Sequence, residues 1–370
     1  MTRRGTIARR RHTLKGASRA SINCAVKAMS KRRPPFLFLC GLLFTASWIA
    51  ATVSQAATVP QTPAIRVIEL APATADEKTP VISSVALDPA GKLVAAVGDD
   101  HLVRLFDVES GAVVHRWKSH TDWVKTSAFR PDGQMLATSG ADRRIHLWDL
   151  TSQAGPRGFS EGLHAINVLA YNSDGRMLAV AGFDGIVRIF DAKEQRQLRE
   201  LAAPGNDIRA LCFSRDGTHL AAAGRAGAVR VWAAESGQQV ADVQVSSRRI
   251  CALAYSPDGK YLAAAGQQRI VRLLDAASAK PVADLPERPG EVLALCFCGP
   301  DLLASAGSGN VIHLWDVSTR QERCELVGHT GSITTLVFNP DATRLISGGY
   351  DTTVRLWDVK KHDEEKMTRR

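Results

Sequence analysis

Residues 354–358 read VRLWD, and the same short pattern recurs along most of the chain. Related segments also end in an aromatic residue followed by aspartate, as in IHLWD at 145–149 and again at 312–316. The aromatic position, filled once by leucine, falls at Phe106, Trp148, Phe190, Trp232, Leu274, Trp315 and Trp357. Successive members of this series are 42, 42, 42, 42, 41 and 42 residues apart. So constant a spacing predicts seven copies of one structural unit.

Each unit contains three further segments with strand-like sequence. An alternating apolar run, such as IRALCF at 208–213, predicts a first strand. A turn follows, for example Pro-Asp-Gly at 131–133, in which proline sets φ and glycine accepts a positive φ. A run of small residues, such as LAAAG at 220–224, predicts a second strand before the aromatic–aspartate strand. A fourth strand is indicated by an apolar residue eleven positions after the aromatic one: Trp117, Phe159, Leu201, Val243, Leu285 and Leu326.

These motifs resemble the WD40-repeat family of β-propellers over about residues 63–360. The resemblance implies an all-β fold with seven blades of four strands each, in a single domain. In that family a histidine, a serine or threonine, an aspartate and the tryptophan of one repeat form a hydrogen-bonded network. Two repeats have all four residues at matching offsets: His120, Thr138, Asp142 and Trp148, and His329, Ser347, Asp351 and Trp357. Elsewhere Ala226, Gln268 and Gly309 replace the aspartate, so those blades are expected to depend on apolar packing.

The seventh repeat lacks a fourth strand, because a polar tail over residues 361–370 follows its aromatic–aspartate motif. The missing segment is predicted near the start of the repeat region. AIRVIEL at 64–70 resembles the fourth segments of the other repeats and aligns with them through Leu70. We therefore expect this N-terminal strand to complete the last blade, which closes the ring and removes an exposed sheet edge.

The N-terminal part of the chain has the composition of an export signal. Residues 1–35 contain eleven Lys or Arg and no acid, and residues 36–53 carry no charge. The small residues that follow complete a signal-peptide core and cleavage region over 36–57. Translation from Met29 would give a signal of ordinary length. The expected location is the periplasm or cell envelope, and an uncleaved inner-membrane anchor over 36–53 is the alternative, since eighteen apolar residues just span a bilayer.

The net charge of +10 comes entirely from the basic n-region over 1–35. The remaining chain has 36 basic and 37 acidic residues. A general phosphate-binding surface needs a clustered excess of base, which this balance does not supply. Nucleic acid is therefore not expected as a partner, and membrane contact is expected only through the N-terminal hydrophobic segment if it stays uncleaved.

The sequence contains no recognisable catalytic or metal-binding motif. The ten histidines form no HExxH or HxxH pattern, and no P-loop, GxSxG elbow, calcium loop or dinucleotide fingerprint occurs. The cysteines beyond the signal region have no metal-clip spacing and are expected to fill the core: Cys212, Cys251, Cys296, Cys298 and Cys324. We predict no catalytic residues, no metal, no cofactor and no enzyme activity.

The residues that interrupt the repeat pattern indicate a binding surface. In WD40 proteins the face where fourth strands lead into first strands commonly binds partners. The exposed positions there include the residue before the first strand and the residue before the turn aspartate. Large rings and arginines, which anchor protein interfaces, occupy five of these positions: Trp123, Phe183, Tyr350, Arg225 and Arg249. We predict that they bind partner proteins on a monomeric propeller.

Two hypotheses of function follow. The first is an exported, non-catalytic scaffold that binds partner proteins on one face, with an arrangement that resembles the secreted WD40-repeat proteins of bacteria. The alternative is an envelope enzyme or small-ligand binder that uses the central channel, a hypothesis that rests on analogy with other propellers.

Overall fold

The computed structural model describes four stretches of the chain: residues 61–71, 79–152, 155–159 and 163–359. All of them belong to the unit that spans residues 57–370. They form 29 β-strands and no helix, so these stretches hold no helix that could cross a membrane. The predictions for the n-region, the signal or anchor segment and the polar tail fall on residues 1–57 and 361–370, outside the described residues.

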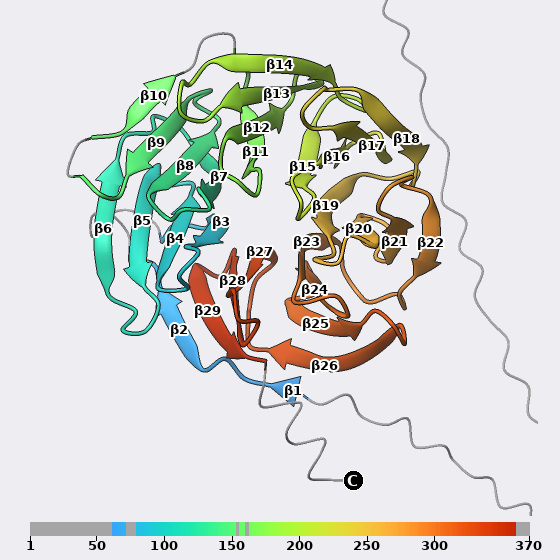
Figure 1. Cartoon of the computed structure of the whole chain (residues 1–370). Helices are drawn as coiled ribbons and strands as arrows, with labels where there is room; N and C mark the ends of the chain where they lie inside the picture. The colour runs from blue at the N-terminus through green and yellow to red at the C-terminus, as the bar shows by residue number, and fades with distance from the viewer. Residues whose placement is uncertain (1–60, 72–78, 153–154, 160–162, 360–370) are drawn as a thin grey trace, which may run out of the picture. The chain divides into compact units, whose positions relative to one another are not determined.

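The strands form seven sheets around a central axis, each sheet being one repeat (Figure 1). The innermost strands are β3 (Ile82–Leu87), β7 (Val124–Phe129), β11 (Ile166–Tyr171), β15 (Ile208–Phe213), β19 (Ile250–Tyr255), β23 (Val292–Phe297) and β27 (Ile333–Phe338). The second strands are β4 (Leu93–Gly98), β8 (Met135–Gly140), β12 (Met177–Gly182), β16 (His219–Gly224), β20 (Tyr261–Gly266), β24 (Leu302–Gly307) and β28 (Arg344–Gly349).

The third strands carry the aromatic–aspartate motif or its variants. They are β5 (Leu102–Asp107), β9 (Ile145–Asp149), β13 (Ile186–Asp191), β17 (Ala228–Ala233), β21 (Val271–Asp275), β25 (Val311–Asp316) and β29 (Thr353–Asp358). The outer strands of the first six blades are β6 (Val113–Lys118), β10 (Arg157–Phe159), β14 (Gln197–Ala202), β18 (Gln239–Gln244), β22 (Pro281–Asp284) and β26 (Gln321–Val327). Within each blade these four strands pair with their neighbours in antiparallel order.

The N-terminal segment supplies the strand that the last blade lacks. β2 (Arg66–Glu69) lies antiparallel to β29, with Ile68 opposite Val354. The innermost strands contact one another in the order β3, β7, β11, β15, β19, β23, β27 and again β3, so the ring is closed. The predicted seven-bladed propeller and its N-terminal closing strand are confirmed.

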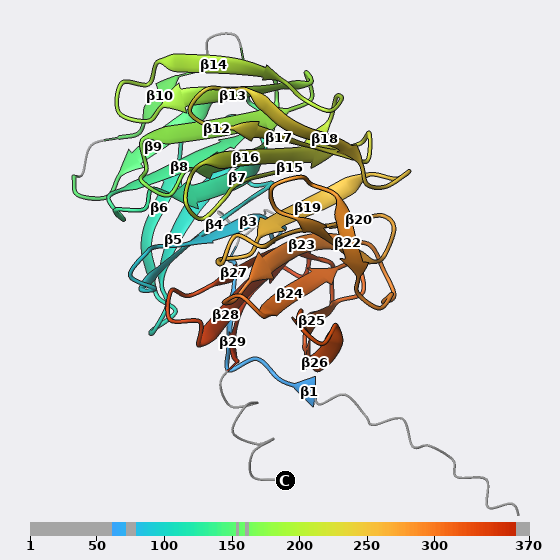
Figure 2. The same ribbon diagram turned by 45° about the vertical axis from the view of Figure 1, so that its right-hand side comes forward.

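A short strand that the sequence analysis did not predict precedes the closing strand. β1 (Gln61–Thr62) pairs in parallel with β26 and adds a fifth strand to the sixth blade. The chain therefore crosses from the rim of the sixth blade to the rim of the seventh before it enters the first blade (Figure 2).

The core of the propeller lies between neighbouring blades. Seven apolar clusters fill the seven interfaces. Between the sixth and seventh blades, for example, Leu314 and Leu326 pack with Trp357, which is fully buried. The second strands are rich in small residues, and Ala222 and Ala264 have no exposed surface, so short side chains let adjacent sheets pack closely.

A glycine ends every second strand because the backbone comes very close there. A Cβ atom on Gly140 would lie 2.0 Å from the carbonyl oxygen of Trp123, and one on Gly266 would lie 2.2 Å from that of Arg249. At the same place the first strand of each blade has a β-bulge, in which one residue is skipped by the pairing: Ser83, Lys125, Asn167, Arg209, Cys251, Leu293 and Thr334. A bulge redirects the side chain of the extra residue.

Replacing Ile68 by Ala is expected to lower the free energy of unfolding by about 2–5 kcal/mol. Ile68 is 7% exposed and packs between the seventh and first blades, so the truncation leaves a cavity at the closure of the ring. The matched control is Val67→Ala on the same strand, where 45% of the residue is exposed and a change below about 1 kcal/mol is expected. Urea unfolding followed by circular dichroism compares them, and equal losses would contradict a closing role for β2.

Candidate functional site

One end of the propeller gathers the loops that hold the predicted binding residues. Innermost strands begin there and second strands end there, because the two are antiparallel. Backbone hydrogen bonds join the two loops of a blade: the amide of Ala141 donates to the carbonyl of Trp123, and that of Tyr350 to Ser332. We call this end the upper face and define it by Val81, Trp123, Ala165, Asp207, Arg249, Glu291 and Ser332 with Asp99, Ala141, Phe183, Arg225, Gln267, Ser308 and Tyr350.

Four of the five predicted binding residues lie on consecutive blades. Trp123, Phe183, Arg225 and Arg249 belong to the second, third, fourth and fifth blades in turn. Tyr350 belongs to the seventh blade, and the sixth and first blades separate it from the other four on either side. Phe183 is 46% and Tyr350 47% exposed, and Arg225 is exposed as well. Aromatic rings and arginines are the residue types that most often anchor protein interfaces.

Trp123 is half-buried and is held on two sides. Its Nε1–H donates to Oγ of Ser83 in the first blade, at 2.5 Å. The Nζ atom of Lys125 lies 2.8 Å from the centroid of the indole ring, a cation–π contact. Trp123 therefore joins two blades and supports a positive charge at the start of β7.

Arg249 is bound within the protein and does not extend freely into solvent. It forms an ion pair with Asp207, with 3.2 Å between its Nη2 and Oδ2. Asp207 also accepts a hydrogen bond of 2.6 Å from Nε of Arg209. Asp207 is buried and has a φ of 59°, a left-handed conformation that costs energy in any residue with a Cβ. A strained, buried carboxylate thus holds two guanidinium groups from the fourth and fifth blades.

Arg209 also contacts the exposed ring of Phe183. Its guanidinium carbon lies 5.3 Å from the centroid of that ring, within range of a cation–π interaction. Arg209 therefore links the third, fourth and fifth blades through Phe183, Asp207 and Arg249. We call these four residues, together with the Trp123–Lys125 pair on the second blade, the mouth cluster and define it by Trp123, Lys125, Phe183, Asp207, Arg209 and Arg249.

Lys125 and Arg209 are residues that the sequence analysis missed. Both occupy the bulge position of an innermost strand, where the other five blades carry Ser, Asn, Cys, Leu or Thr. Burial and then the positive charge of Arg209 lower the pKa of Lys125 to about 8, against the opposite effect of Asp122 and Asp99. Lys125 and Arg209 both lie at the start of an innermost strand on the upper face, and the third blade stands between their two blades. The sequence signal that could have identified them is a basic residue at the bulge position, where the other repeats have none.

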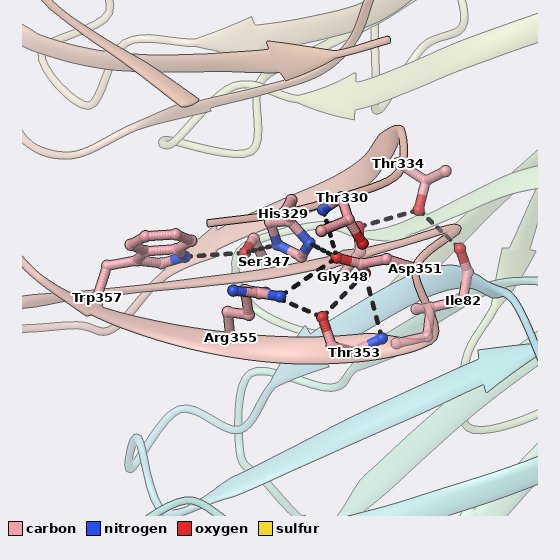
Figure 3. Close-up of polar contacts among 10 residues, drawn as sticks. All are labelled: Ile82, His329, Thr330, Thr334, Ser347, Gly348, Asp351, Thr353, Arg355 and Trp357. Carbon is pink, nitrogen blue, oxygen red and sulfur yellow. Dashed lines mark hydrogen bonds and ion pairs between the residues drawn. The ribbon is translucent and has the colours of Figure 1, made fainter. Parts of the chain in front are cut away.

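The predicted quartet of the seventh blade forms one hydrogen-bonded chain (Figure 3). Nε1–H of Trp357 donates to Oγ of Ser347 at 2.9 Å, and this hydroxyl donates to Nε2 of His329 at 2.7 Å. Nδ1–H of His329 then donates to Asp351 at 2.8 Å. In this order each group has a partner, which buried polar atoms require.

The quartet of the second blade repeats this arrangement. His120 contacts Asp142 and Thr138, both at 2.7 Å, and Trp148 donates to Thr138 at 2.9 Å. In the sixth blade, where Gly309 replaces the aspartate, only the bond from Trp315 to Ser305 is present, at 2.8 Å. The complete quartets therefore fasten the loops of the upper face in two blades.

Asp351 connects its quartet to the loops of the upper face. It accepts hydrogen bonds from the amide of Thr330, at 3.0 Å, and from the hydroxyl of Thr353, at 2.9 Å (Figure 3). Next to it, the hydroxyl of Thr334 donates to the carbonyl of Ile82 in the first blade, at 2.8 Å. The bulge residue of the seventh blade thus fixes the neighbouring blade across the closure of the ring.

Among the described residues, two groups of side chains have the chemistry of metal ligands, with donor atoms within 4.8 Å of one another: His120, Asp142 and His146, and His313, Glu322 and Glu325. Both nitrogens of His120 already bind Asp142 and Thr138. Glu322 accepts hydrogen bonds from His313 and Arg288. Internal partners thus account for much of each group, and the absence of a metal or cofactor stays a prediction.

The opposite end of the channel is a funnel of about 680 Å³, lined by turns from all seven blades. Burial raises the pKa of Cys296 in its wall to about 11, so this side chain is a neutral thiol at pH 7. Asp88, also in the wall, accepts hydrogen bonds from the amides of Lys92 and Leu93 and so caps a turn. Both side chains therefore have structural roles, and neither favours a reaction in the funnel.

Two family models match the chain. The model of the WD domain, G-beta repeat, matches residues 74–107, 111–149, 160–191, 237–275 and 320–358. The model of the Anaphase-promoting complex subunit 4 WD40 domain matches residues 199–253.

Short segments are also similar to curated fungal proteins. Sixty residues are 42% identical to Eukaryotic translation initiation factor 3 subunit I of Schizosaccharomyces pombe, over 16% of this chain and 18% of that protein. Sixty are 32% identical to Small ribosomal subunit protein RACK1 of Neurospora crassa, and sixty are 33% identical to MST50-interacting protein 11 of Pyricularia oryzae, each over 16% of this chain and 19% of the relative. The chain thus spans less than a fifth of these relatives, and the resemblance to secreted bacterial proteins stays an expectation.

Replacing Ser347 by Ala is expected to destabilise the protein more than replacing Ser305 by Ala. The first change removes the partner of both His329 and Trp357 and leaves a buried imidazole nitrogen unpaired, while the second removes only the partner of Trp315. A difference of about 1–3 kcal/mol is expected from the unpaired group. Urea unfolding measures it, and equal losses would show that the histidine adds nothing to the tryptophan–serine bond.

Acidification from pH 6.5 to pH 4 is expected to weaken the propeller through His146. Burial, and then the neighbouring His120, lower the pKa of His146 from 6.5 to about 4. In this window the unfolded chain takes up a proton that the folded chain does not, so the free energy of unfolding falls as the pH falls, by up to about 1.4 kcal/mol per pH unit. Thermal unfolding at several pH values should show a smaller slope for His146→Gln. The exposed His164→Gln should leave the slope unchanged.

Proposed function

Because the chain belongs to the WD40-repeat family of β-propellers, we propose that it is an exported, non-catalytic scaffold that holds partner proteins on its upper face. The observation that carries this proposal is the mouth cluster, which gathers aromatic rings and bases from four consecutive blades around the channel. Aromatic residues and arginine supply most of the binding energy in many protein interfaces.

The family supports protein binding in general terms. WD40 propellers commonly bind other proteins, and the name MST50-interacting protein 11 describes one relative as an interaction partner. Two other relatives are named as a subunit of a translation initiation factor and as a protein of the small ribosomal subunit. Because the matches cover less than a fifth of each relative, only the binding of proteins as a class is carried over to this chain.

The proposed mechanism is the rigid display of side chains. Trp123, Arg209 and Arg249 are already fixed by contacts within the propeller, so a partner that binds them restricts little further motion. Less ordering at the interface leaves more of the contact energy for affinity. Phe183, Arg225 and Tyr350 add exposed surface around these fixed groups.

The export part of the proposal rests on the N-terminal sequence alone. A basic n-region over 1–35 precedes an uncharged core over 36–53 and small residues up to 57. Mass spectrometry of the protein from its native cell fraction tests it. A mature N-terminus near residue 57 supports cleavage, a membrane-bound chain that retains 36–53 supports the anchor, and an unprocessed chain in the cytosol contradicts export.

The binding face is tested by affinity capture from the native cell envelope with a C-terminally tagged bait. The variant Phe183→Ala/Arg225→Ala/Tyr350→Ala is expected to lose a partner that the unchanged protein retains. The matched control is Val240→Ala/Val282→Ala, which truncates residues that are 47% and 51% exposed on outer strands. All three baits should unfold at similar temperatures, because the changed side chains are exposed. A partner kept equally by both variants would exclude the upper face.

A further inference from the structure

We infer that the mouth cluster is a carboxylate-binding site, which receives an acidic group of the partner protein at the mouth of the channel. This inference rests on the proposed function, because it names the chemistry of the partner on the same face. The inference adds Lys125 and Arg209 to the residues that are predicted to bind the partner, and it gives these two residues the central role in binding.

The mouth cluster holds more positive than negative charge. Lys125, Arg209 and Arg249 carry three positive charges, and Asp207 is the carboxylate that contacts two of them. The loops beside the cluster add exposed Arg225 and Arg248 in the fourth and fifth blades. Acidic neighbours on the upper face are Asp99, Asp122 and Glu291, and among the described residues none of them forms an ion pair with these bases.

The donors of the cluster are partly buried and are not all used. Nε of Arg249 is buried and has no hydrogen-bond partner among the described residues. Lys125 is half-buried over the face of Trp123, and within the part of the chain that the structure describes its Nζ has a cation–π contact but no ion pair. A guanidinium offers five N–H donors and an ammonium three. Charged donors that have lost water gain most from an anion, because the local dielectric is low.

The aromatic rings make the site a fixed one. Trp123 lies beneath Lys125, and Phe183 lies beside Arg209, so each cation is held against a flat ring. Asp207, which is buried and has a left-handed backbone, binds both Arg209 and Arg249. The three cations lie at or beside the starts of β7, β15 and β19, on the upper face of the second, fourth and fifth blades. A planar carboxylate is the anion that the fork of a guanidinium matches. The chain beyond residue 35 is nearly neutral, so the three bases of the mouth cluster are not part of a general basic surface.

A carboxylate at this site would change the titration of Lys125. The groups that act on Lys125 are Arg209 on β15, Asp122 before β7 and Asp99 after β4, and burial together with Arg209 holds its pKa near 8. An added negative charge favours the protonated amine and raises that pKa. Binding should therefore weaken between pH 7 and pH 9, as the free protein loses the proton of Lys125.

The probe is a fluorescently labelled octa-glutamate peptide with an amidated C-terminus, titrated with the full mature protein and followed by anisotropy. Lys125→Met and Arg209→Met should each weaken binding by roughly tenfold or more. The matched control is Lys193→Met, which removes an exposed lysine from the turn after β13, at the opposite end of the propeller. It should change the affinity by less than about twofold.

Lys125→Arg supplies a second, conservative variant. It retains the charge but not the titration near pH 8, so it should bind octa-glutamate while losing the pH dependence seen with the unchanged protein. This readout separates a direct role of Lys125 from a structural one, since a structural defect would lower the affinity at every pH. Thermal unfolding of each variant confirms that the propeller is intact.

Two further peptides identify the source of the carboxylate. Octa-glutamine with a free C-terminus binds if the site takes a chain end, and amidated octa-glutamate binds if it takes side chains. Amidated octa-glutamine should not bind. The inference is overturned if no acidic peptide binds, or if octa-glutamate binds equally to all variants. If the unchanged protein binds no acidic peptide but still captures its partner, the carboxylate site is rejected and the proposed scaffold function is retained.

Discussion

Each blade of the propeller is a sheet with two apolar faces, and it can bury both only between two neighbours. The seven inter-blade clusters show how completely this requirement is met. The interface between the last and first blades depends on a strand from the other end of the chain, since Ile68 and Leu70 pack there with Ile82. Closure of the ring therefore stabilises every other interface. It also fixes the distance of each innermost strand from the axis, and this distance sets the width of the channel mouth.

The same backbone arrangement, a glycine beside a β-bulge, forms the upper face in all seven blades. The glycine at the end of each second strand lets the backbone approach the residue before the first strand, and the bulge beside it redirects one side chain. The framework is nearly the same in every blade, but the side chains are not. Lys125 and Arg209 lie where the other blades carry small or neutral residues. A regular backbone therefore carries basic side chains in only two of its blades at this position.

The repeat spacing predicted the number of blades, the order of their strands and the closing strand, because a period near 42 residues leaves little choice of register. The quartet residues were predictable for the same reason. The mouth cluster was not, because its contacts join different repeats: Asp207 and Arg249 are 42 positions apart, and Phe183 and Arg209 are 26 apart. Strand alternation also gives no sign of a bulge. Trp123 and Arg249 were expected as exposed anchors, whereas internal partners hold both.

The pairing of β2 with β29 also has a kinetic consequence. Ile68 and Val354 lie opposite each other but are 286 positions apart along the chain. Hairpins within a blade join segments that are close in sequence and form early, while a contact of this separation carries the largest loop-closure cost and forms late. Until the whole repeat region has been made, β2 has no partner strand and the outer edge of β29 stays open, although β29 already pairs with β28. During that interval β2 of one molecule can pair with β29 of another at high protein concentration. The strand pair that completes the monomer is therefore also the place where domain swapping is most expected.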